Sequence, residues 1–321
     1  MSEGTILHLE ANPLAADAIK IAVKIDVHTL RGTREGVPAL IEMLERYRAR
    51  ATFLFSLGPD SAGRQLRGAL LRAITRGARP PRLLGHYGWN RLLSGALLPP
   101  PDIGERCGEV LRSVRAAGFE VGVRSIDEAS WDKQIDRANA TWTRLQMERA
   151  RARFREVFGE NPRVHAAAGW RMNRHAYRLT QLLGFDYCSD TLGTQPYVPI
   201  YQAELIACPQ LPTTLPTMAN LLDQGLSSEA AAERILSDSE SVRPSGHVYN
   251  AHAEVEGLKL KPHFERLLQT WKSRNVNLLS LSDYFDALPD KDLPRHEVSR
   301  TRLPRGSRDV AVQGEEFLAG Y

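Results

Sequence analysis

The feature that most constrains this chain is the alternation of short apolar runs with longer amphipathic runs. The short runs predict strands and the longer ones predict helices. The run Glu35–Arg50, for example, sets Leu40, Leu44 and Tyr47 on one helical face. Strands are predicted at Ile21–Val27, Ala51–Leu57, Phe119–Arg124, Val164–Ala168, Phe185–Ser189, Leu205–Cys208, His247–Ala251 and Val276–Leu281. Helices are predicted at Glu35–Arg50, Gln65–Arg76, Ile103–Ala117, Thr141–Phe158, Arg174–Leu183, Ser228–Asp238 and His263–Arg274.

Strand–helix alternation favours a mostly parallel sheet with helices outside it. About seven or eight such units over ~250 residues suit one barrel better than two domains. We therefore predict an α/β fold with a single (β/α) barrel of seven or eight strands, allowing for distortion, over residues 21–288. Residues 1–20 are predicted to be an N-terminal extension. The polar, proline-punctuated residues 289–321 are predicted to be a flexible C-terminal tail, with a docked partner-binding tail as the alternative.

Cysteine usage and the N-terminus indicate the cell compartment. The chain has three cysteines without C-x-x-C spacing, which argues against a disulfide framework or a cysteine-rich zinc site. The first residues lack the basic and then apolar pattern of a signal peptide. Apolar runs fall short of the ~20 residues that span a bilayer. These features predict a cytoplasmic protein, either soluble or peripheral on the cytoplasmic face of the inner membrane.

Polar residues collect after five of the predicted strands. The groups are Asp26 with His28, Arg124 with Asp127 and Glu128, Trp170 with Arg171, Asp190, and His252 with Glu254. Because parallel barrels carry their chemistry at the C-terminal ends of the strands, we expect these groups to meet at one rim. A solvated or salt-bridged loop residue is the alternative for any one of them.

Six segments are similar to the polysaccharide deacetylase superfamily: KIDVHTLRGTREGVP, ATFLFSLGPD, AAGWR, YCSDTLG, QLPTTLPT and HAEVEG. Among them, RGTREG and HAEVEG resemble the branch of deformylases that act on undecaprenyl-phosphate-linked 4-deoxy-4-formamido-L-arabinose in lipid A modification. The similarity extends from about Lys24 to Phe285. It implies a hydrolase that removes a formyl or acetyl group from an amino sugar, with a polyprenyl-phosphate-linked sugar as substrate.

The resemblance also implies a mechanism. A divalent metal such as zinc lowers the pKa of its bound water and polarises the amide carbonyl. In the positions of this sequence, Asp26 matches the general base and His252 the general acid. Arg171 matches the arginine that keeps the base ionised, and Asp190 matches the aspartate that orients the histidine.

The metal-ligand positions depart from the family pattern. The first motif reads D-V-D in the branch and Asp26-Val27-His28 here; the second reads H-x-x-x-H in the branch and runs from Arg124 to Glu128 here. His28 and Glu128 can still bind zinc, with Asp127 as a further candidate, whereas a guanidinium has no free lone pair. Arg124 could instead pair with Glu128 or Asp26. An intact site, a weakened or displaced site, and no metal site all stay open.

Further residues are candidates for contact with substrate or membrane. Arg31 and Arg34 could bind the substrate phosphate, with an ion pair to Glu35 as the alternative, and Trp170 and Glu254 could contact the sugar. Residues 64–91 hold seven arginines and no acid, around an amphipathic run with interfacial aromatics. This composition predicts binding to an anionic membrane surface; a plain surface helix is the alternative. No recognisable motif accompanies the charge, so a nucleic-acid partner is not predicted.

Three functional hypotheses follow, in this order. The first is an amino-sugar deformylase or deacetylase in which Asp26 and His252 move the protons. The second is a catalytically impaired pseudo-enzyme that binds the sugar-lipid or a partner. The third is a sugar hydrolase that works without metal through the same two residues.

Overall fold

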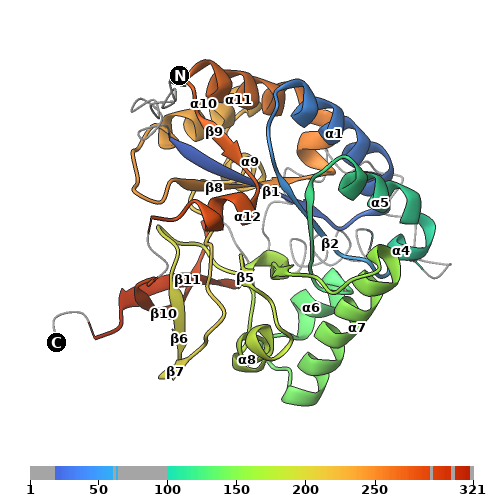
Figure 1. Cartoon of the computed structure of the whole chain (residues 1–321), viewed down its shortest axis with the longest axis vertical. Coiled ribbons are helices and arrows are strands. Elements are labelled where there is room, and N and C mark those ends of the chain that lie inside the picture. The colour runs from blue at the N-terminus through green and yellow to red at the C-terminus, as the bar shows by residue number, and fades with distance from the viewer. Residues whose placement is uncertain (1–18, 61–62, 64–99, 290–291, 305–307, 319–321) are drawn as a thin grey trace, which may run out of the picture.

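A rolled parallel sheet forms the centre of the molecule (Figure 1). The computed structural model describes residues 19–60, 63, 100–289, 292–304 and 308–318, and within them this sheet has seven strands. Its order is β5-β4-β3-β2-β1-β8, and β9 pairs with β1 as well. The strands are β1 (Lys20–Val27), β2 (Thr52–Phe55), β3 (Glu120–Val123), β4 (Val164–His165), β5 (Tyr187–Cys188), β8 (His247–His252) and β9 (Asn277–Leu279).

The segment that follows β7 (Glu204–Leu205) closes the sheet on itself. The backbone N–H of Leu211 donates to Cys188 O of β5 at 2.7 Å, and that of Thr214 donates to Val248 O of β8 at 3.1 Å. These bonds bridge the two end strands through an irregular stretch of chain. The predicted fold class is therefore confirmed: a single, distorted (β/α) barrel.

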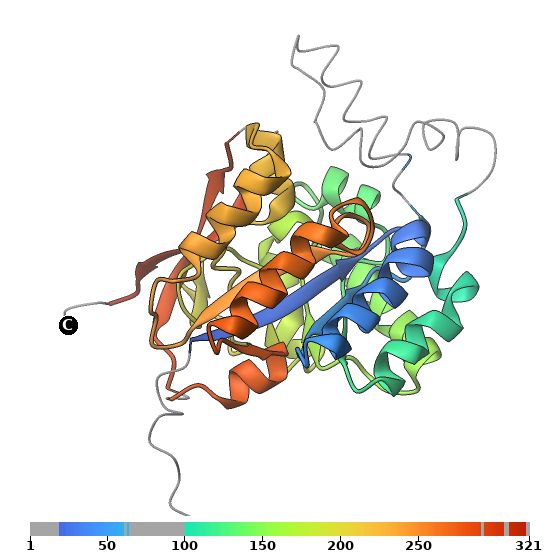
Figure 2. The same cartoon turned by 90° about the horizontal axis from the view of Figure 1, so that it is seen from above.

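Helices cover the outside of the sheet, with α1 and α11 on one side and α7 on the other in Figures 1 and 2. They are α1 (Val37–Arg46), α4 (Ile103–Arg106), α5 (Gly108–Ala116), α6 (Glu128–Gln134), α7 (Ala140–Phe158), α8 (Arg174–Leu182), α9 (Met218–Gln224), α10 (Ser228–Asp238), α11 (Lys261–Ser273) and α12 (Leu281–Asp286). Seven of the eight residues of β1 are buried, as expected for a strand covered on both faces.

Two short π-helical segments, η2 (Gly32–Gly36) and η5 (Val255–Lys259), pack against each other above β1 and β8. A Cβ added to Gly36 would lie 2.1 Å from Ala253 O, and one added to Gly257 would lie 2.7 Å from Gly36 O. Only glycine permits so close an approach of two backbones. Gly36 of RGTREG and Gly257 of HAEVEG are thus required by one contact, which holds η2 against η5 at the ends of β1 and β8.

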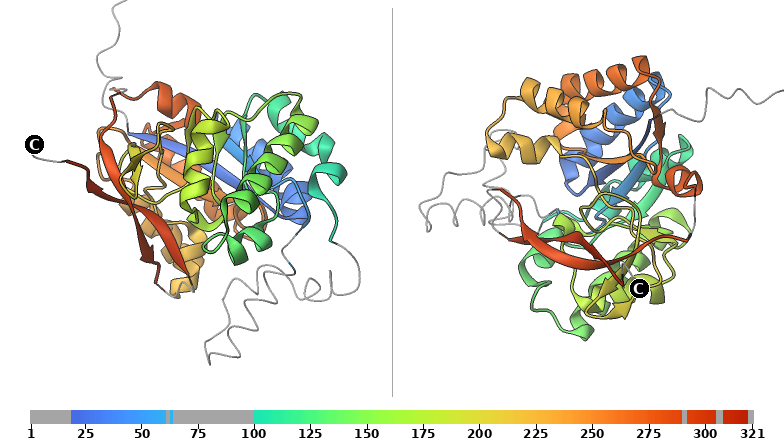
Figure 3. Two further views of the ribbon diagram at one scale, coloured as in Figure 1. Left: turned by 90° about the horizontal axis from the view of Figure 1, so that it is seen from below. Right: turned by 90° about the vertical axis from the view of Figure 1, so that its left-hand side faces the viewer.

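A second sheet corrects two predictions. Its order is β11-β10-β6-β7, with β6 at Val198–Tyr201, β10 at Arg295–Arg302 and β11 at Asp309–Glu316. Of the predicted barrel strand at Leu205–Cys208, only Leu205 lies in a strand, the short β7 of this second sheet, and the rest is irregular. The tail expected to be flexible forms the β10–β11 hairpin, drawn in red in Figure 3. Its polar composition gave no sign of this, because backbone hydrogen bonds to β6 and between β10 and β11 hold the hairpin while most of its side chains stay at least partly exposed.

Some expectations fall outside the described residues. They concern residues 1–18, which make up most of the expected N-terminal extension, and residues 64–91, the expected membrane-binding segment with its helix Gln65–Arg76. The domain boundaries at 20 and 288 stay predictions. In the part of the chain that the structure describes, no helix combines the length and apolarity that a membrane crossing needs.

Candidate active site

Asp26 and His252 face each other at the C-terminal ends of β1 and β8. They are register partners in the parallel pairing of these strands. Asp26 Oδ2 and His252 Nε2 are 3.7 Å apart, with the two side chains 9% and 17% exposed. Residues that are more than two hundred positions apart in sequence thus lie at one point of the barrel rim, with a carboxylate next to an imidazole.

Arg124 stands between two carboxylates at the same rim. It follows β3, and its backbone N–H donates to Phe55 O at the end of β2. Its guanidinium, 3% exposed, forms a short ion pair with Asp26 Oδ2 and a second one, of 2.9 Å, with Glu128 Oε1. Glu128 Oε1 also accepts a hydrogen bond of 2.9 Å from Ser56 Oγ. A positive charge is therefore buried where three strand ends converge.

His28 and Glu254 form a second buried ion pair, with His28 Nε2 2.7 Å from Glu254 Oε1. Burial lowers the pKa of His28, but the carboxylates of Glu254 and Glu128 outweigh burial and raise it to about 9. The imidazole is therefore protonated at neutral pH. Burial raises the pKa of Glu254, and the His28 charge outweighs it, so the net direction is downward.

The two central groups differ in ionisation. Burial raises the pKa of Asp26, but the charges of Arg124, His252 and Lys24 outweigh it and hold the pKa at about 2. Burial lowers the pKa of His252, against the pull of Asp26. At neutral pH the rim therefore holds an Asp26 carboxylate beside a neutral His252 imidazole.

The residues at this rim do not fit the divalent metal that the sequence resemblance implies. Arg124 carries a fixed positive charge and no lone pair. Its guanidinium occupies carboxylate oxygens of both Asp26 and Glu128, which a metal would need. His28 Nε2 faces Glu254, and its raised pKa keeps the ring protonated rather than available as a ligand. These residues therefore support no catalytic step through a metal at this position.

Arg171 does not hold Asp26 ionised, which corrects its predicted role. Its guanidinium forms ion pairs with Asp132, at 2.8 Å, and with Asp136, both from the region of α6. Its carbonyl accepts a hydrogen bond of 2.8 Å from Trp131 Nε1. Arg171 thus anchors α6 to the barrel, and Arg124 is the arginine that pairs with Asp26.

Asp190 also differs from its predicted role, because it pairs with His165 rather than orienting His252. Asp190 Oδ1 lies 2.8 Å from His165 Nδ1, and Asp190 Oδ2 accepts from Gln210 Nε2 at 3.0 Å. Cys188 lies beside this pair, and the ligand atoms of His165, Cys188 and Asp190 lie within 4.8 Å of one another. These residue types could hold a metal. Sequence reasoning missed the group because His165, Cys188 and Asp190 show no metal-ligand spacing in the sequence.

Two further residues support the rim from β8 and η5: Asn250, which sequence reasoning missed, and Glu256, which follows His252 in the HAEVEG motif. Asn250 Nδ2 donates to Asp26 Oδ2 at 3.1 Å. Glu256 accepts hydrogen bonds from the His252 backbone N–H at 2.8 Å and from Tyr249 OH at 3.1 Å. Burial raises the pKa of Glu256 to about 8. The signal for Asn250 was its period-two spacing from His252, which places both side chains on one face of the strand.

The predicted substrate residues are dispersed. Arg31 forms an exposed ion pair of 2.8 Å with Glu35, Glu254 is engaged by His28, and Trp170 is buried with Nε1 3.2 Å from Thr213 Oγ1.

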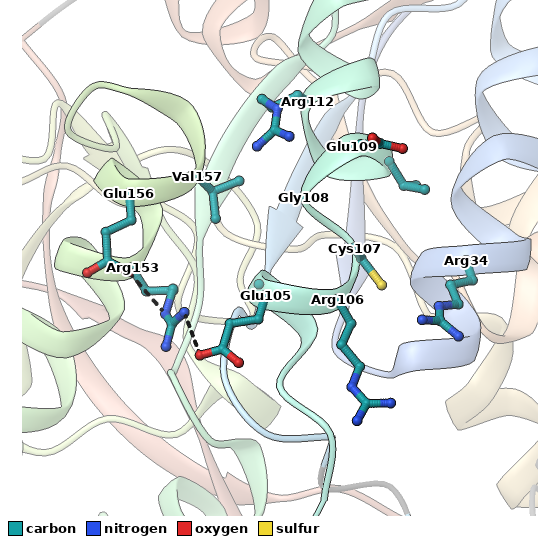
Figure 4. Close-up of a pocket in the computed structure, with 12 residues that line it drawn as sticks. Arg34, Glu105, Arg106, Cys107, Gly108, Glu109, Arg112, Arg153, Glu156 and Val157 are labelled. Atoms are coloured by element: carbon teal, nitrogen blue, oxygen red, sulfur yellow. Dashed lines mark hydrogen bonds and ion pairs between the residues drawn. The ribbon is translucent and has the colours of Figure 1, made fainter.

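Arg34 lines a cavity of about 530 Å³ (Figure 4). Arg106, Arg112 and Arg153 line it too, around the first turn of α5. Arg153 also forms ion pairs of 3.4 Å with Asp102 and with Glu105. Three glutamates, Glu105, Glu109 and Glu156, line the cavity beside the four arginines. The segment η2, which carries Arg34, also touches the Glu254 side of the rim through Gly32.

Comparison with known proteins shows which family the chain belongs to. No family model matches the sequence. The "Probable 4-deoxy-4-formamido-L-arabinose-phosphoundecaprenol deformylase ArnD" of Shewanella sediminis is 32% identical over 282 residues, covering 87% of this chain and 90% of that protein. The protein with the same description in Wigglesworthia glossinidia brevipalpis is 26% identical over 287 residues, covering 88% and 98%.

Among solved structures, the "putative polysaccharide deacetylase from Mycobacterium smegmatis" aligns with a TM-score of 0.63 at 17% identity, covering 94% of this chain and 100% of that one. This likeness supports the fold, and the identity to the Shewanella protein supports the family. The chain therefore belongs to the family of the 4-deoxy-4-formamido-L-arabinose-phosphoundecaprenol deformylases, which are amide hydrolases.

Proposed function

We propose that this chain acts on the formyl or acetyl amide of an amino sugar linked to polyprenyl phosphate, the substrate class that the names of its relatives describe for those proteins. The observation that carries the proposal is the Asp26–His252 pair, with its 3.7 Å separation at the barrel rim. In this proposal the sugar-lipid is a precursor in lipid A modification, and the protein binds it at the cytoplasmic face of the inner membrane.

Asp26 and His252 would share the proton transfers of amide hydrolysis. Asp26 Oδ1 and His252 Nδ1 are buried and have no hydrogen-bond partner among the described residues. Asp26 would therefore take a proton from a water molecule as the water attacks the amide carbon, and the neutral His252 imidazole would pass that proton on to the leaving amine as the C–N bond breaks. The charges of Arg124 and His28 would favour the oxyanion that develops on the amide oxygen.

In this proposal the phosphate of the substrate binds to the arginines of the cavity near Arg34. Arg34, Arg106 and Arg112 bring three guanidinium groups to its wall. Guanidinium matches the geometry and charge of phosphate. Binding to an anionic membrane surface through residues 64–91 remains part of this proposal.

A second candidate function is binding of the sugar-lipid or a partner without turnover. The observation that favours it is the ion pair between Arg124 and Asp26. This pair is one reason why the pKa of Asp26 stays at about 2, and a carboxylate of such low pKa is a weak base. Slow hydrolysis or none is expected if Arg124 stays in place during the reaction.

Formate or acetate release from the lipid-linked amido sugar distinguishes the two candidates. A hydrolase releases the acid with the wild-type chain, and Asp26→Asn or His252→Ala abolishes release. The pseudo-enzyme binds the same lipid without release. In that case the triple variant His28→Asp, Arg124→His and Glu128→His gains activity with added zinc. A chain that neither binds nor hydrolyses the lipid would refute both proposals.

A further inference from the structure

We propose that the Arg124 guanidinium takes the place of a divalent metal between the carboxylates of Asp26 and Glu128. With Arg124 present these carboxylates already have a cationic partner, and the rim binds zinc only when Arg124 is removed. This inference concerns the charge at the site. It holds whether or not the chain turns over a substrate, so its failure and the failure of the proposed function can be told apart.

The position of the guanidinium is the first argument. Arg124 reaches the oxygens of Asp26 from β1 and of Glu128 from α6 at once. These two carboxylates converge from different elements on one point, which is the arrangement by which proteins hold a cation. Because the guanidinium is only 3% exposed, it fills that point rather than lying over it.

The balance of charge is the second argument. Three buried carboxylates surround the rim: Asp26, Glu128 and Glu254. Arg124 pairs with the first two, and His28 pairs with the third at 2.7 Å. A metal added to this set would meet a fixed positive charge at low effective dielectric, which opposes its binding.

The ligands that remain without Arg124 are the third argument. Ser56 and Asn250 contact Glu128 and Asp26 as neutral donors and leave both carboxylates charged. Removal of Arg124 would therefore leave the buried Asp26 and Glu128 carboxylates without this ion-pair partner, with His252 Nε2 3.7 Å from Asp26 Oδ2. Carboxylate oxygen and imidazole nitrogen are ligand types that zinc accepts.

The test measures zinc binding by isothermal titration calorimetry on the full chain, together with the shift in melting temperature that zinc causes. Arg124→Ala removes the cation, and Arg124→Gln keeps a hydrogen-bond donor without charge, in case the alanine variant does not fold. Arg124→Lys keeps the charge. Arg178→Ala is the matched control, since it breaks an exposed arginine–carboxylate pair, with Glu204, away from the rim.

Zinc affinity is expected to rise at least ~100-fold in Arg124→Ala or Arg124→Gln, with a higher melting temperature on zinc addition. Wild type, Arg124→Lys and Arg178→Ala should show neither effect. The gain must disappear when Glu128→Gln is added, which assigns it to this rim and not to the group of His165, Cys188 and Asp190.

Two results would overturn the inference. One is stoichiometric zinc on the wild-type chain that Glu128→Gln removes, since the metal would then coexist with Arg124. The other is a folded Arg124→Ala or Arg124→Gln variant whose zinc affinity equals that of wild type.

Discussion

Replacement of Arg124 by methionine should be one of the most destabilising single changes at the rim. Methionine matches much of the arginine side chain in length but removes the charge. Asp26 and Glu128 would then be left as buried carboxylates without their cation. Removal of one partner from a buried ion pair costs about 3–5 kcal/mol, and the wild-type pair is 3% and 9% exposed at Arg124 and Asp26.

The loss should depend on pH, and the sign follows from Asp26. Its pKa of about 2 lies below the ordinary value of 3.8, so its contribution to stability is present above pH 3.8 and is lost as pH falls through 2. Without Arg124, burial raises the pKa of the same carboxyl group. Asp26 of the variant can then take up a proton in mildly acidic solution. The difference in unfolding free energy between wild type and variant should therefore become smaller from pH 7 towards pH 4.

Urea denaturation followed by circular dichroism at pH 7, 5.5 and 4 measures the deficit. A second protein carrying Asp26→Asn and Glu128→Gln beside Arg124→Met should recover much of the lost stability, because no buried charge is left unpaired. A deficit below about 1 kcal/mol at pH 7, which is the range of an exposed ion pair, would refute the reasoning, as would a deficit that stays constant with pH.

Two more predictions concern the loops that carry the rim. Gly36→Ala should destabilise the fold by roughly 2–4 kcal/mol, because its Cβ would meet Ala253 O at 2.1 Å. Gly108→Ala should be tolerated, because its Cβ would meet only the flexible end of a side chain at 3.1 Å. Thermal denaturation compares the two variants, and equal melting temperatures would contradict the packing argument. Glu256 has its pKa raised by burial from 4.5 to about 8, so its favourable contribution is complete below pH 4.5 and lost as pH rises through 8. Relative to Glu256→Gln, wild type should therefore lose about 3–5 kcal/mol between pH 5 and 9 in urea denaturation; parallel pH profiles would show that the carboxyl group is ionised throughout.

The regular part of the fold could be read from the sequence because burial and periodicity go together there. β1 and β8 carry β-branched, aromatic and other apolar residues at closely spaced positions, and their burial is nearly complete. The β10–β11 hairpin could not be read in this way. Its residues are largely polar, and backbone pairing with β6 and with Leu192 holds it in place.

The candidate site, too, could be predicted only in part. The spacing of Asp26 and His252 after two strands was enough to predict that they meet, because strand ends of a parallel barrel share one rim. The partners of Arg171 and Asp190 could not be predicted, since a long or buried polar side chain turns toward whichever group the tertiary packing brings near. Asp132 and His165 occupy those positions.

The hairpin at the C-terminal end has a consequence for solubility. β10 lies along β6, with the Val198 N–H donating to Pro294 O at 2.9 Å. A chain shortened to residue 288 would expose that side of β6 as an unpaired edge, and unpaired edges recruit strands from other molecules. Such a protein is expected to self-associate as its concentration rises, even if the barrel itself keeps its shape.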